Sequence, residues 1–377
     1  MRIGIPAETR TGERRVAATP ETVKKLVAGG RHQVVVQADA GTSAAVSDTH
    51  FTEAGATVVP TAAEVYAQAD IVLKVRGPEA GELPALRRGT ILAALLNPTD
   101  RQGLEQLAAT GVTGFALEWL PRITRAQAMD VLSSQANIAG YKAVMLAANE
   151  YGRFMPMLMT AAGTVKAARV LVLGAGVAGL QAIATAKRLG AVIEAFDVRP
   201  AVKEQVESLG AKFVEVPLSD DEKKQAETAG GYAREMSDDY KQRQSALIQE
   251  RARQADIVIT TALIPGRPAP VLVTEDTVRS MKQGSVIVDL AVEQGGNCPL
   301  SERDQVVIKH GVSLIGYCNL PALLAADASA LYARNLLNFF NLLVDGKTGE
   351  LNLDRNDEII AGSLACIDGA VVERGAR

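Results

Sequence analysis

A glycine-rich turn between a strand and a helix constrains this chain more than any other feature. Gly174, Gly176 and Gly179 follow the apolar run RVLVL and open the helical stretch GLQAIATAKRLG. In a dinucleotide-binding βαβ unit the first glycine permits the tight turn, the second lets a pyrophosphate approach the backbone, and the third lets helix and strand pack closely. The first N–H groups of the helix, near Val177, then face the anion. The motif alone is weak, so the pattern around it has to support it.

A carboxylate occupies the position that is expected to bind the ribose of a cofactor. Asp197 closes the next strand, VIEAFD, about 20 residues after the third glycine, where an acid binds the hydroxyls of the adenosine ribose. Because a carboxylate repels a 2′-phosphate, we expect NAD rather than NADP. Arg199 is either a cation that meets a 2′-phosphate or an ordinary charge at a strand end. Val198 lies between them, and all three are candidate cofactor contacts.

The loop TTALIPGRPAP, which begins at Thr260, follows another strand of the same set. Open α/β sheets bind ligands at the carboxyl ends of their strands. Ala262 and Leu263 are therefore candidates for lining the adenine or nicotinamide pocket. A turn fixed by its prolines is the alternative.

Length and pattern predict two domains. At 377 residues the chain exceeds the ~250–300 residues at which single cores stop growing. Short β-branched runs alternate with amphipathic segments in the N-terminal part, and a second such set begins at Arg169. We predict an α/β fold of two doubly wound Rossmann-like domains with a cleft between them, joined by long helices. The first comprises residues 1–133 and 325–377, and the second comprises residues 134–324.

Two long helices are predicted at the domain junctions. The stretch 124–151 has good helix formers and no proline, and we expect it to connect the domains. A second helix, ADASALYARNLLNFFNLLV, follows the last strand of the second set and is expected to return to the first domain.

Composition argues against several functions. A formal net charge of -3 gives no basic excess for nucleic acid. Cys298, Cys318 and Cys366 have no CxxC spacing, so neither a disulfide framework nor a zinc or other metal site is expected. The longest apolar stretch, 331–344, is interrupted by an arginine and several asparagines, and the start MRIGIPAETR lacks a secretory apolar segment. We expect a cytoplasmic chain without direct membrane insertion.

Polar side chains gather at the start of the predicted connecting helix. On a helix, Gln127, Asp130 and Ser134 would lie near one face. The group is either a solvated interdomain helix or the part of the cleft that holds the nicotinamide half of the cofactor. Its members are Arg122, Arg125, Gln127, Asp130, Ser133, Ser134, Gln135 and Asn137.

One segment interrupts the βα rhythm. Residues 217–240 are rich in charge and contain Gly230 and Gly231, which is too polar for a core element and long for a loop. The segment is either a solvated surface excursion or a lid that closes over a ligand.

A set of segments together resembles the NAD(H)-binding component of proton-translocating transhydrogenase, over Arg2 to about Asn338. They are PRITRAQAMDVLSSQANIAGY, MTAAGTV, GAGVAGLQAIATAKRLGA, DVR, ETAGGYAREM, TTALIPGRPAPVL and IVDLAVEQGGNCPL. The resemblance implies that Arg122, Gln127 and Asp130 are the catalytic residues that orient the dihydronicotinamide, and that Gln127 also reaches the partner's nucleotide. Further cofactor contacts implied in the same region are Ile123, Thr124, Arg125 and Ser133.

The resemblance also makes the segment ETAGGYAREM the family's mobile loop. Tyr232 and Met236 would close over bound NAD(H), with Gly231 as a further contact.

The same resemblance implies partners. The chain would form a homodimer and would work with an NADP(H)-binding subunit and a membrane-spanning proton-channel subunit. It would then lie peripherally on the cytoplasmic face of the inner membrane, as one subunit of a proton-translocating, Re/Si-specific NAD(P)+ transhydrogenase.

The N-terminal pattern also resembles alanine dehydrogenase. Arg15 in ERRVAATP and Lys74 in IVLKV match the two cations that hold pyruvate in that enzyme. In this chain they are either such ligands or structural ion-pair partners.

The proton-handling residues favour the transhydrogenase over the dehydrogenase. Oxidising an amino acid needs a general base, most often histidine. Asn97 stands where the dehydrogenase has its histidine, and Glu293 where it has an aspartate. Hydride transfer between two nicotinamides needs ring alignment and no base.

We interpret the three histidines, His32, His50 and His310, as surface or turn residues. An NAD sensor, the non-enzymatic alternative, would have no use for the polar group at 122–137.

Overall fold

The computed structural model describes residues 1–216, 238–264 and 266–373. The chain forms two compact units, one of residues 1–135 together with residues from Pro321 onward, and one of residues 136–320. The sequence patterns placed these boundaries at 133/134 and 324/325. We call them the first and the second unit.

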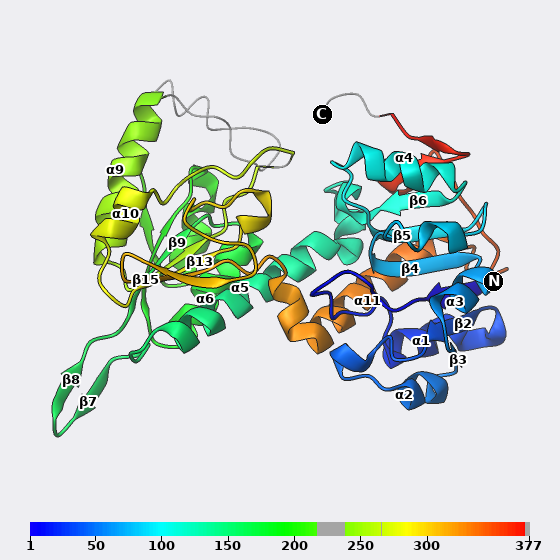
Figure 1. The fold of residues 1–377 in the computed structure, drawn as a ribbon, viewed down its shortest axis with the longest axis horizontal. Coiled ribbons are helices and arrows are strands. Elements are labelled where there is room, and N and C mark those ends of the chain that lie inside the picture. The colour runs from blue at the N-terminus through cyan, green and yellow to red at the C-terminus, as the bar shows by residue number, and fades with distance from the viewer. Residues whose placement is uncertain (217–237, 265, 374–377) are drawn as a thin grey trace. The chain divides into compact units, whose positions relative to one another are not determined.

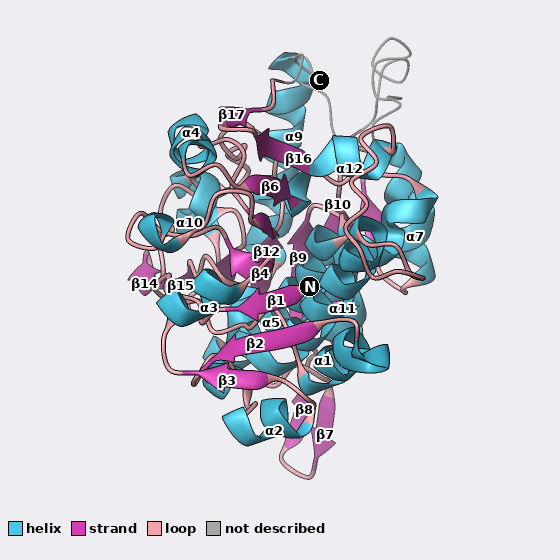
Figure 2. Cartoon of the chain, turned by 90° about the vertical axis from the view of Figure 1, so that its right-hand side faces the viewer, coloured by secondary structure: helices cyan, strands magenta, loops and turns pink. Residues whose placement is uncertain are grey.

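The first unit is built on an eight-stranded sheet of order β17-β16-β6-β5-β4-β1-β2-β3. Strands β1 to β6 are parallel, and β16 and β17 are antiparallel additions at the edge. All five side chains of β5 are buried, as expected for a parallel strand covered on both faces. Figure 2 shows β1, β2 and β3 side by side. The bounds are β1 (Arg2–Ile5), β2 (Gln33–Gln37), β3 (Thr57–Val59), β4 (Ile71–Arg76), β5 (Ile91–Leu95), β6 (Thr113–Ala116), β16 (Leu364–Ile367) and β17 (Ala370–Val371).

The C-terminal part of the chain supplies much of this unit's core. Helix α11 buries an apolar face that includes Leu336, Phe339 and Phe340, at the spacing of a helix packed on one side. On the same face, the Tyr332 hydroxyl donates to the Lys74 and Val75 carbonyls at 3.0 and 3.1 Å. The helices are α1 (Pro20–Val27), α2 (Asp48–Glu53), α3 (Ala62–Gln68), α4 (Arg101–Ala109), α11 (Ala325–Leu343) and α12 (Glu358–Ser363).

The predicted continuous helix over 124–151 is wrong at its start. Residues Thr124–Met129 form the 3-10 helix η5, and α5 begins only at Val131 and runs to Glu150. Asp130 between them has ψ 87°, outside the helical region, and its carboxylate accepts the Ser133 N–H at 2.9 Å and the Ser133 hydroxyl at 2.5 Å. Aspartate favours this capping position because its side chain replaces helical backbone bonds. Gln127 and Asp130 therefore do not share one helix face with Ser134.

The second unit is built on a seven-stranded sheet of order β11-β10-β9-β12-β13-β15-β14. All pairs are parallel except β14 with β15. The strand order reverses between β9 and β12, which is where doubly wound sheets bind ligands. The bounds are β9 (Arg169–Leu173), β10 (Val192–Phe196), β11 (Lys212–Val214), β12 (Ile257–Thr260), β13 (Val286–Asp289), β14 (Val306–Lys309) and β15 (Val312–Ile315).

Helices and one separate hairpin complete the second unit. The hairpin of β7 (Leu158–Thr160) and β8 (Gly163–Val165) extends away from the sheet (Figure 1). The remaining helices are α6 (Val177–Arg188), α7 (Lys203–Ser208), α9 (Asp238–Gln254) and α10 (Glu275–Ser280).

Short 3-10 helices connect many of these elements. They are η1 (Ala28–Gly30), η2 (Thr42–Ala44), η3 (Leu83–Ala85), η4 (Leu117–Trp119), η5 (Thr124–Met129), η6 (Pro200–Val202), η7 (Val292–Gln294) and η8 (Leu320–Leu324). Within the ranges that the structure describes, we find no helix with the length and apolarity to cross a bilayer.

Candidate functional site

The glycine turn follows β9 and leads directly into α6. Gly174 has φ 100°, and a Cβ there would lie 2.6 Å from the Thr261 hydroxyl. A Cβ on Gly179 would lie 1.8 Å from the Gly174 carbonyl oxygen, so the helix can pack this closely only with glycine. A Cβ on Gly176 would meet nothing within 4 Å, and this N-cap residue contributes no side-chain acceptor to the helix. The start of α6, at Val177, is therefore open to an anion.

Asp197 follows β10, the neighbouring strand, and is 9% exposed. Its Oδ2 accepts the Ala175 N–H at 2.7 Å, which fixes the backbone of the glycine turn. Arg199 donates to both carboxylate oxygens, from Nε at 2.9 Å and from Nη2 at 2.8 Å, and its N–H donates to Oδ1 at 2.9 Å. Neither interpretation of Arg199 included this two-pronged ion pair. Ribose hydroxyls at Asp197 would have to share or replace these donors.

The loop after β12 lies against the glycine turn. The Thr261 hydroxyl donates to the Gly174 carbonyl at 3.0 Å. Ala262 follows it, and Leu263 is 44% exposed. The structure thus brings Gly174, Asp197 and Ala262 to the carboxyl edge of three adjacent strands, β9, β10 and β12.

A buried asparagine that the sequence patterns did not single out holds this loop. Asn297 is fully buried and bonds both backbone groups of Ala262. The two residues are 35 positions apart, so no local pattern connects them.

The polar residues of 122–133 belong to the first unit. Arg122, Thr124 and Gln127 are exposed, and Ile123 is half-buried. Arg125 forms an ion pair with Asp357 at 2.6 Å. The loop is therefore held in place while its glutamine side chain stays accessible.

Two asparagines of α11 fix the same loop. The side-chain amides of Asn335 and Asn338 both donate to the Ala128 carbonyl, at 2.8 and 3.0 Å. In the sequence, these asparagines indicated only that the apolar stretch 331–344 is not a membrane span. Their helical spacing on a mostly apolar helix is the signal that could have identified a polar attachment point.

The candidate contacts Gly231 and Tyr232, with Met236, lie outside the described residues. So does most of the polar segment 217–240.

Arg15 is buried and bonded to groups of the first unit. It is 2% exposed, and its guanidinium binds Glu13 through Nε at 2.8 Å and Nη2 at 2.6 Å. Its Nη1 donates to the Gln135 side chain at 2.9 Å. The ion-pair interpretation of Arg15 describes this arrangement.

Lys74 is fully buried between two carboxylates. Its Nζ lies 3.0 Å from Glu82 Oε1 and 3.7 Å from Glu8 Oε2. Burial raises the pKa of Glu8 despite the attraction of Lys74. Burial also opposes ionisation of Glu82, but Lys74 and the Tyr66 hydroxyl hold the pKa of Glu82 below its usual value. Lys74 is thus a structural ion-pair partner in this structure.

The two positions that the sequence comparison with a dehydrogenase assigned to proton handling carry an asparagine and an exposed glutamate. Asn97 is exposed in a turn after β5, with φ 52°, and its N–H donates to Glu118 at 2.8 Å. Glu293 is exposed in η7. The aspartate of that region, Asp289, is fully buried and accepts the N–H groups of Ala291, Asn297 and Cys298.

The histidines lie at surfaces and turns, as the sequence patterns indicated. His50 is exposed and contacts the N-cap Ser47 of α2. His310 has φ 53° in the turn between β14 and β15, 2.9 Å from Glu275. His32 is half-buried, with its ring edge-on to Phe340.

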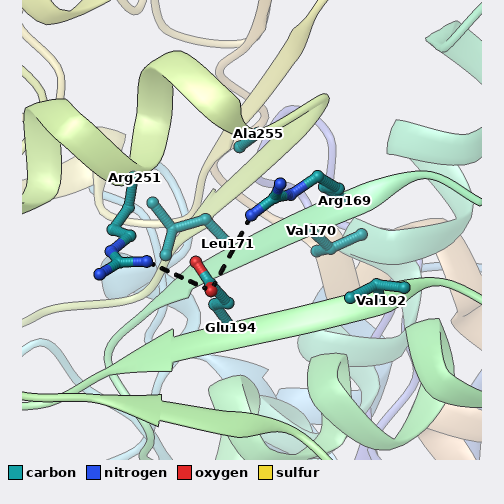
Figure 3. A pocket seen from close by; sticks show the side chains of 7 residues that line it. All are labelled: Arg169, Val170, Leu171, Val192, Glu194, Arg251 and Ala255. Atoms are coloured by element: carbon teal, nitrogen blue, oxygen red, sulfur yellow. Dashed lines mark ion pairs between the residues drawn. The ribbon is translucent and has the colours of Figure 1, made fainter.

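A small cavity of the second unit lies beside the first residues of β9 and β10, next to α9 (Figure 3). It holds about 10 Å³ and is bordered by Arg169, the first residue of β9. Glu194 inside it is paired with Arg169 at 4.0 Å and with Arg251 at 3.5 Å. At this size and position it is a packing gap and not a nucleotide site.

The doubly wound sheet, the glycine turn and the acid after the next strand define a Rossmann-type protein with a dinucleotide-binding turn. The chain belongs to the alanine dehydrogenase/PNT family. Residues 4–139 match the model of its N-terminal domain, and residues 143–374 match that of its C-terminal domain.

Within the family, the chain is similar to transhydrogenase subunits. It is 54% identical to the first part of NAD(P) transhydrogenase subunit alpha of Rhodospirillum rubrum, over 99% of this chain and 98% of that protein. It is 35% identical to the alanine dehydrogenase of Mycobacterium tuberculosis, over 99% of this chain and 95% of that one. A solved transhydrogenase structure from Sinorhizobium meliloti has a TM-score of 0.89 and 49% identity, with 99% of this chain and 100% of that chain covered.

Proposed function

We propose that this chain is the NAD(H)-binding subunit of a proton-translocating NAD(P) transhydrogenase. The observation that carries the proposal is the site at the carboxyl edge of the second unit, where Asp197 holds the glycine turn. The high identity to proteins named as transhydrogenase alpha subunits supports it.

The described residues fit a dinucleotide. The absence of a side-chain cap at Gly176 leaves the first N–H groups of α6 to bind the pyrophosphate. Asp197 accepts the ribose hydroxyls in place of donors from Arg199 and disfavours a 2′-phosphate, which selects NAD(H) over NADP(H). Ala262 and Leu263 border the base or the nicotinamide.

NAD(H) supplies the hydride chemistry, and the chain's task is to bind and orient. We propose that Arg122, Gln127 and Asp130 orient the nicotinamide half. Asp130 and Ser133 are already rigid through their mutual hydrogen bonds, whereas Gln127 is exposed and can reach a partner's nucleotide. An NADP(H)-binding subunit presents the acceptor, and a membrane-spanning subunit couples the transfer to proton movement.

Residue chemistry supports this proposal over alanine dehydrogenase. Asn97 cannot titrate, and Arg15 and Lys74 are already paired with carboxylates. Transfer between two nicotinamides moves no proton at the reacting carbon. A transhydrogenase therefore needs no general base at positions 97 and 293.

The assembly is part of the proposal. We propose a homodimer that associates with the other two subunits at the cytoplasmic face of the inner membrane, with Re/Si stereospecificity.

The test mixes the purified chain with an NADP(H)-binding subunit and follows hydride transfer from NADH to an NADP⁺ analogue of distinct absorbance. Transfer is expected only when both proteins are present. A titration by fluorescence should show tighter binding of NADH than of NADPH. No transfer, together with pyruvate- and ammonium-dependent oxidation of NADH by the chain alone, would assign the chain to alanine dehydrogenase instead.

A further inference from the structure

Asn297 ties together both ends of the loop that follows β12. Its Oδ1 accepts the Ala262 N–H at 3.1 Å, and its Nδ2 donates to the Ala262 carbonyl at 2.9 Å. The same Nδ2 donates to the Pro270 carbonyl at 2.8 Å. One fully buried carboxamide thus bonds the backbone on both sides of the loop.

Hydrogen bonds of its own backbone N–H and carbonyl groups hold Asn297 in place. Its N–H donates to Asp289 Oδ1 at 3.2 Å, and its carbonyl accepts the N–H groups of Leu272 and Val273 at 2.9 and 3.0 Å. Asp289 also accepts the Thr260 hydroxyl at 3.0 Å, which links the ends of β12 and β13. The position of the Asn297 carboxamide relative to the carboxyl ends of β12 and β13 is therefore fixed.

The position of Asn297 also constrains the glycine turn, through Thr261 and Ala262. Thr261, one residue before Ala262, donates its hydroxyl to the Gly174 carbonyl. The Ala262 nitrogen lies 3.3 Å from the position that a Cβ of Gly174 would occupy. A shift of Ala262 would therefore move the loop against the backbone that is proposed to bind the dinucleotide.

We propose that Asn297 is a positioning residue that sets the affinity for NAD(H) by holding Ala262 against the glycine turn, without touching the dinucleotide. The inference rests on the proposed function. The arrangement needs a planar group with one acceptor and two N–H donors. A carboxylate would present only acceptors to the Ala262 and Pro270 carbonyls, and an aliphatic side chain would leave three half-buried backbone groups without this partner.

Two substitutions and a pH series test this. In Asn297→Asp the shape is retained, and burial raises the pKa of the new carboxyl group. At pH 8 we expect the Kd of NADH to rise at least tenfold. At pH 5.5 the protonated carboxyl group again has an acceptor and one of the two donors, so part of the affinity should return. Asn297→Leu should lose affinity equally at both pH values.

The controls separate positioning from charge and from folding. Asn341→Asp adds the same charge at an exposed position of α11 and should leave the Kd unchanged at both pH values. Circular dichroism reports whether each variant folds, and Asn297→Ala replaces Asn297→Leu if the latter does not. A wild-type Kd in the neutral variant would show that the aspartate acts by repelling phosphate, which overturns the inference.

Other outcomes are equally distinct. Wild-type affinity in both variants at pH 8 also overturns the positioning role while leaving the proposed function intact. If the wild-type chain itself does not bind NADH, the proposed function fails and the inference fails with it.

Discussion

The close crossing of α5 and α6 within the second unit leads to a quantitative prediction for Gly140→Ala. A Cβ on Gly140 would lie 2.1 Å from the Ala178 carbonyl oxygen and 3.0 Å from the Ala178 Cα. Because ordinary C···O contacts are at about 3.3 Å, the two helices would have to separate by roughly 1 Å. The atoms that must move are backbone atoms of α6, which cannot rotate away as a side chain can.

Two effects oppose each other in this variant. Replacing glycine by alanine inside a helix stabilises it by about 1 kcal/mol. Overpacking typically costs about 1–3 kcal/mol, and rigid backbone places this site at the upper end. We expect the free energy of unfolding to fall by about 1–2 kcal/mol, which for a unit of this size lowers Tm by roughly 3–6 °C.

The same displacement reaches the candidate site. Ala178 is the second residue of α6, so a shift there moves the N–H groups that are proposed to bind the pyrophosphate. We expect the Kd of NADH to rise about tenfold, which corresponds to about 1.4 kcal/mol. Calorimetry and a fluorescence titration measure the two quantities.

A matched control lies on the same helix. Asn149 is exposed on α5, and Asn149→Ala should gain about 0.5 kcal/mol from helix propensity and bind NADH normally. The reasoning is refuted if Gly140→Ala is as stable as this control and binds NADH like the wild type.

Four other changes test separate parts of the structure. Asp197→Asn removes charge-assisted bonds worth about 1.5–3 kcal/mol, so NADH titration should show a Kd ~10–100-fold higher and weaker discrimination against NADPH. Gln127→Asn should slow hydride transfer far more than it weakens NADH binding in stopped-flow and titration assays, and equal losses would point to a plain binding residue. Lys74→Met leaves Glu8 and Glu82 buried without their cation and should cost about 3–5 kcal/mol in urea unfolding, against under about 1 kcal/mol for the exposed pair in Lys25→Met. Burial raises the pKa of Cys298 and Cys366 each to about 11, so a thiol reagent at pH 8 should modify Cys318 first and the other two only after unfolding; three fast thiols would contradict this burial.

The parts of the structure that sequence could predict are those set by local patterns. The glycine turn and Asp197 are positioned by a strand, a tight turn and a helix that follow one another, and apolar periodicity marks all three. The start of α5 was also readable in principle, because aspartate before an apolar run is a capping signal. The predicted start at Thr124 is wrong because helix propensity alone continues across Asp130, whose side chain caps α5 there.

The parts that could not be predicted depend on distant contacts. Asn297 and Ala262 meet only once β12 and β13 are neighbours. From the C-terminal part of the chain, β16 pairs with β6 and β17 pairs with β16. Arg199 has the charge expected for a phosphate ligand, and only its geometry shows that it pairs with Asp197.

The attachment of Ala128 to Asn335 and Asn338 has a consequence for the order of events during synthesis. These partners are 207 and 210 residues apart, and the whole second unit is encoded between them. Domains generally fold as units while the chain emerges from the ribosome. The glycine turn can therefore form before α11 is available to the segment bearing Gln127. A nascent chain that ends before Pro321 would carry a folded Rossmann unit, while the Gln127 segment would still lack its bonds to Asn335 and Asn338.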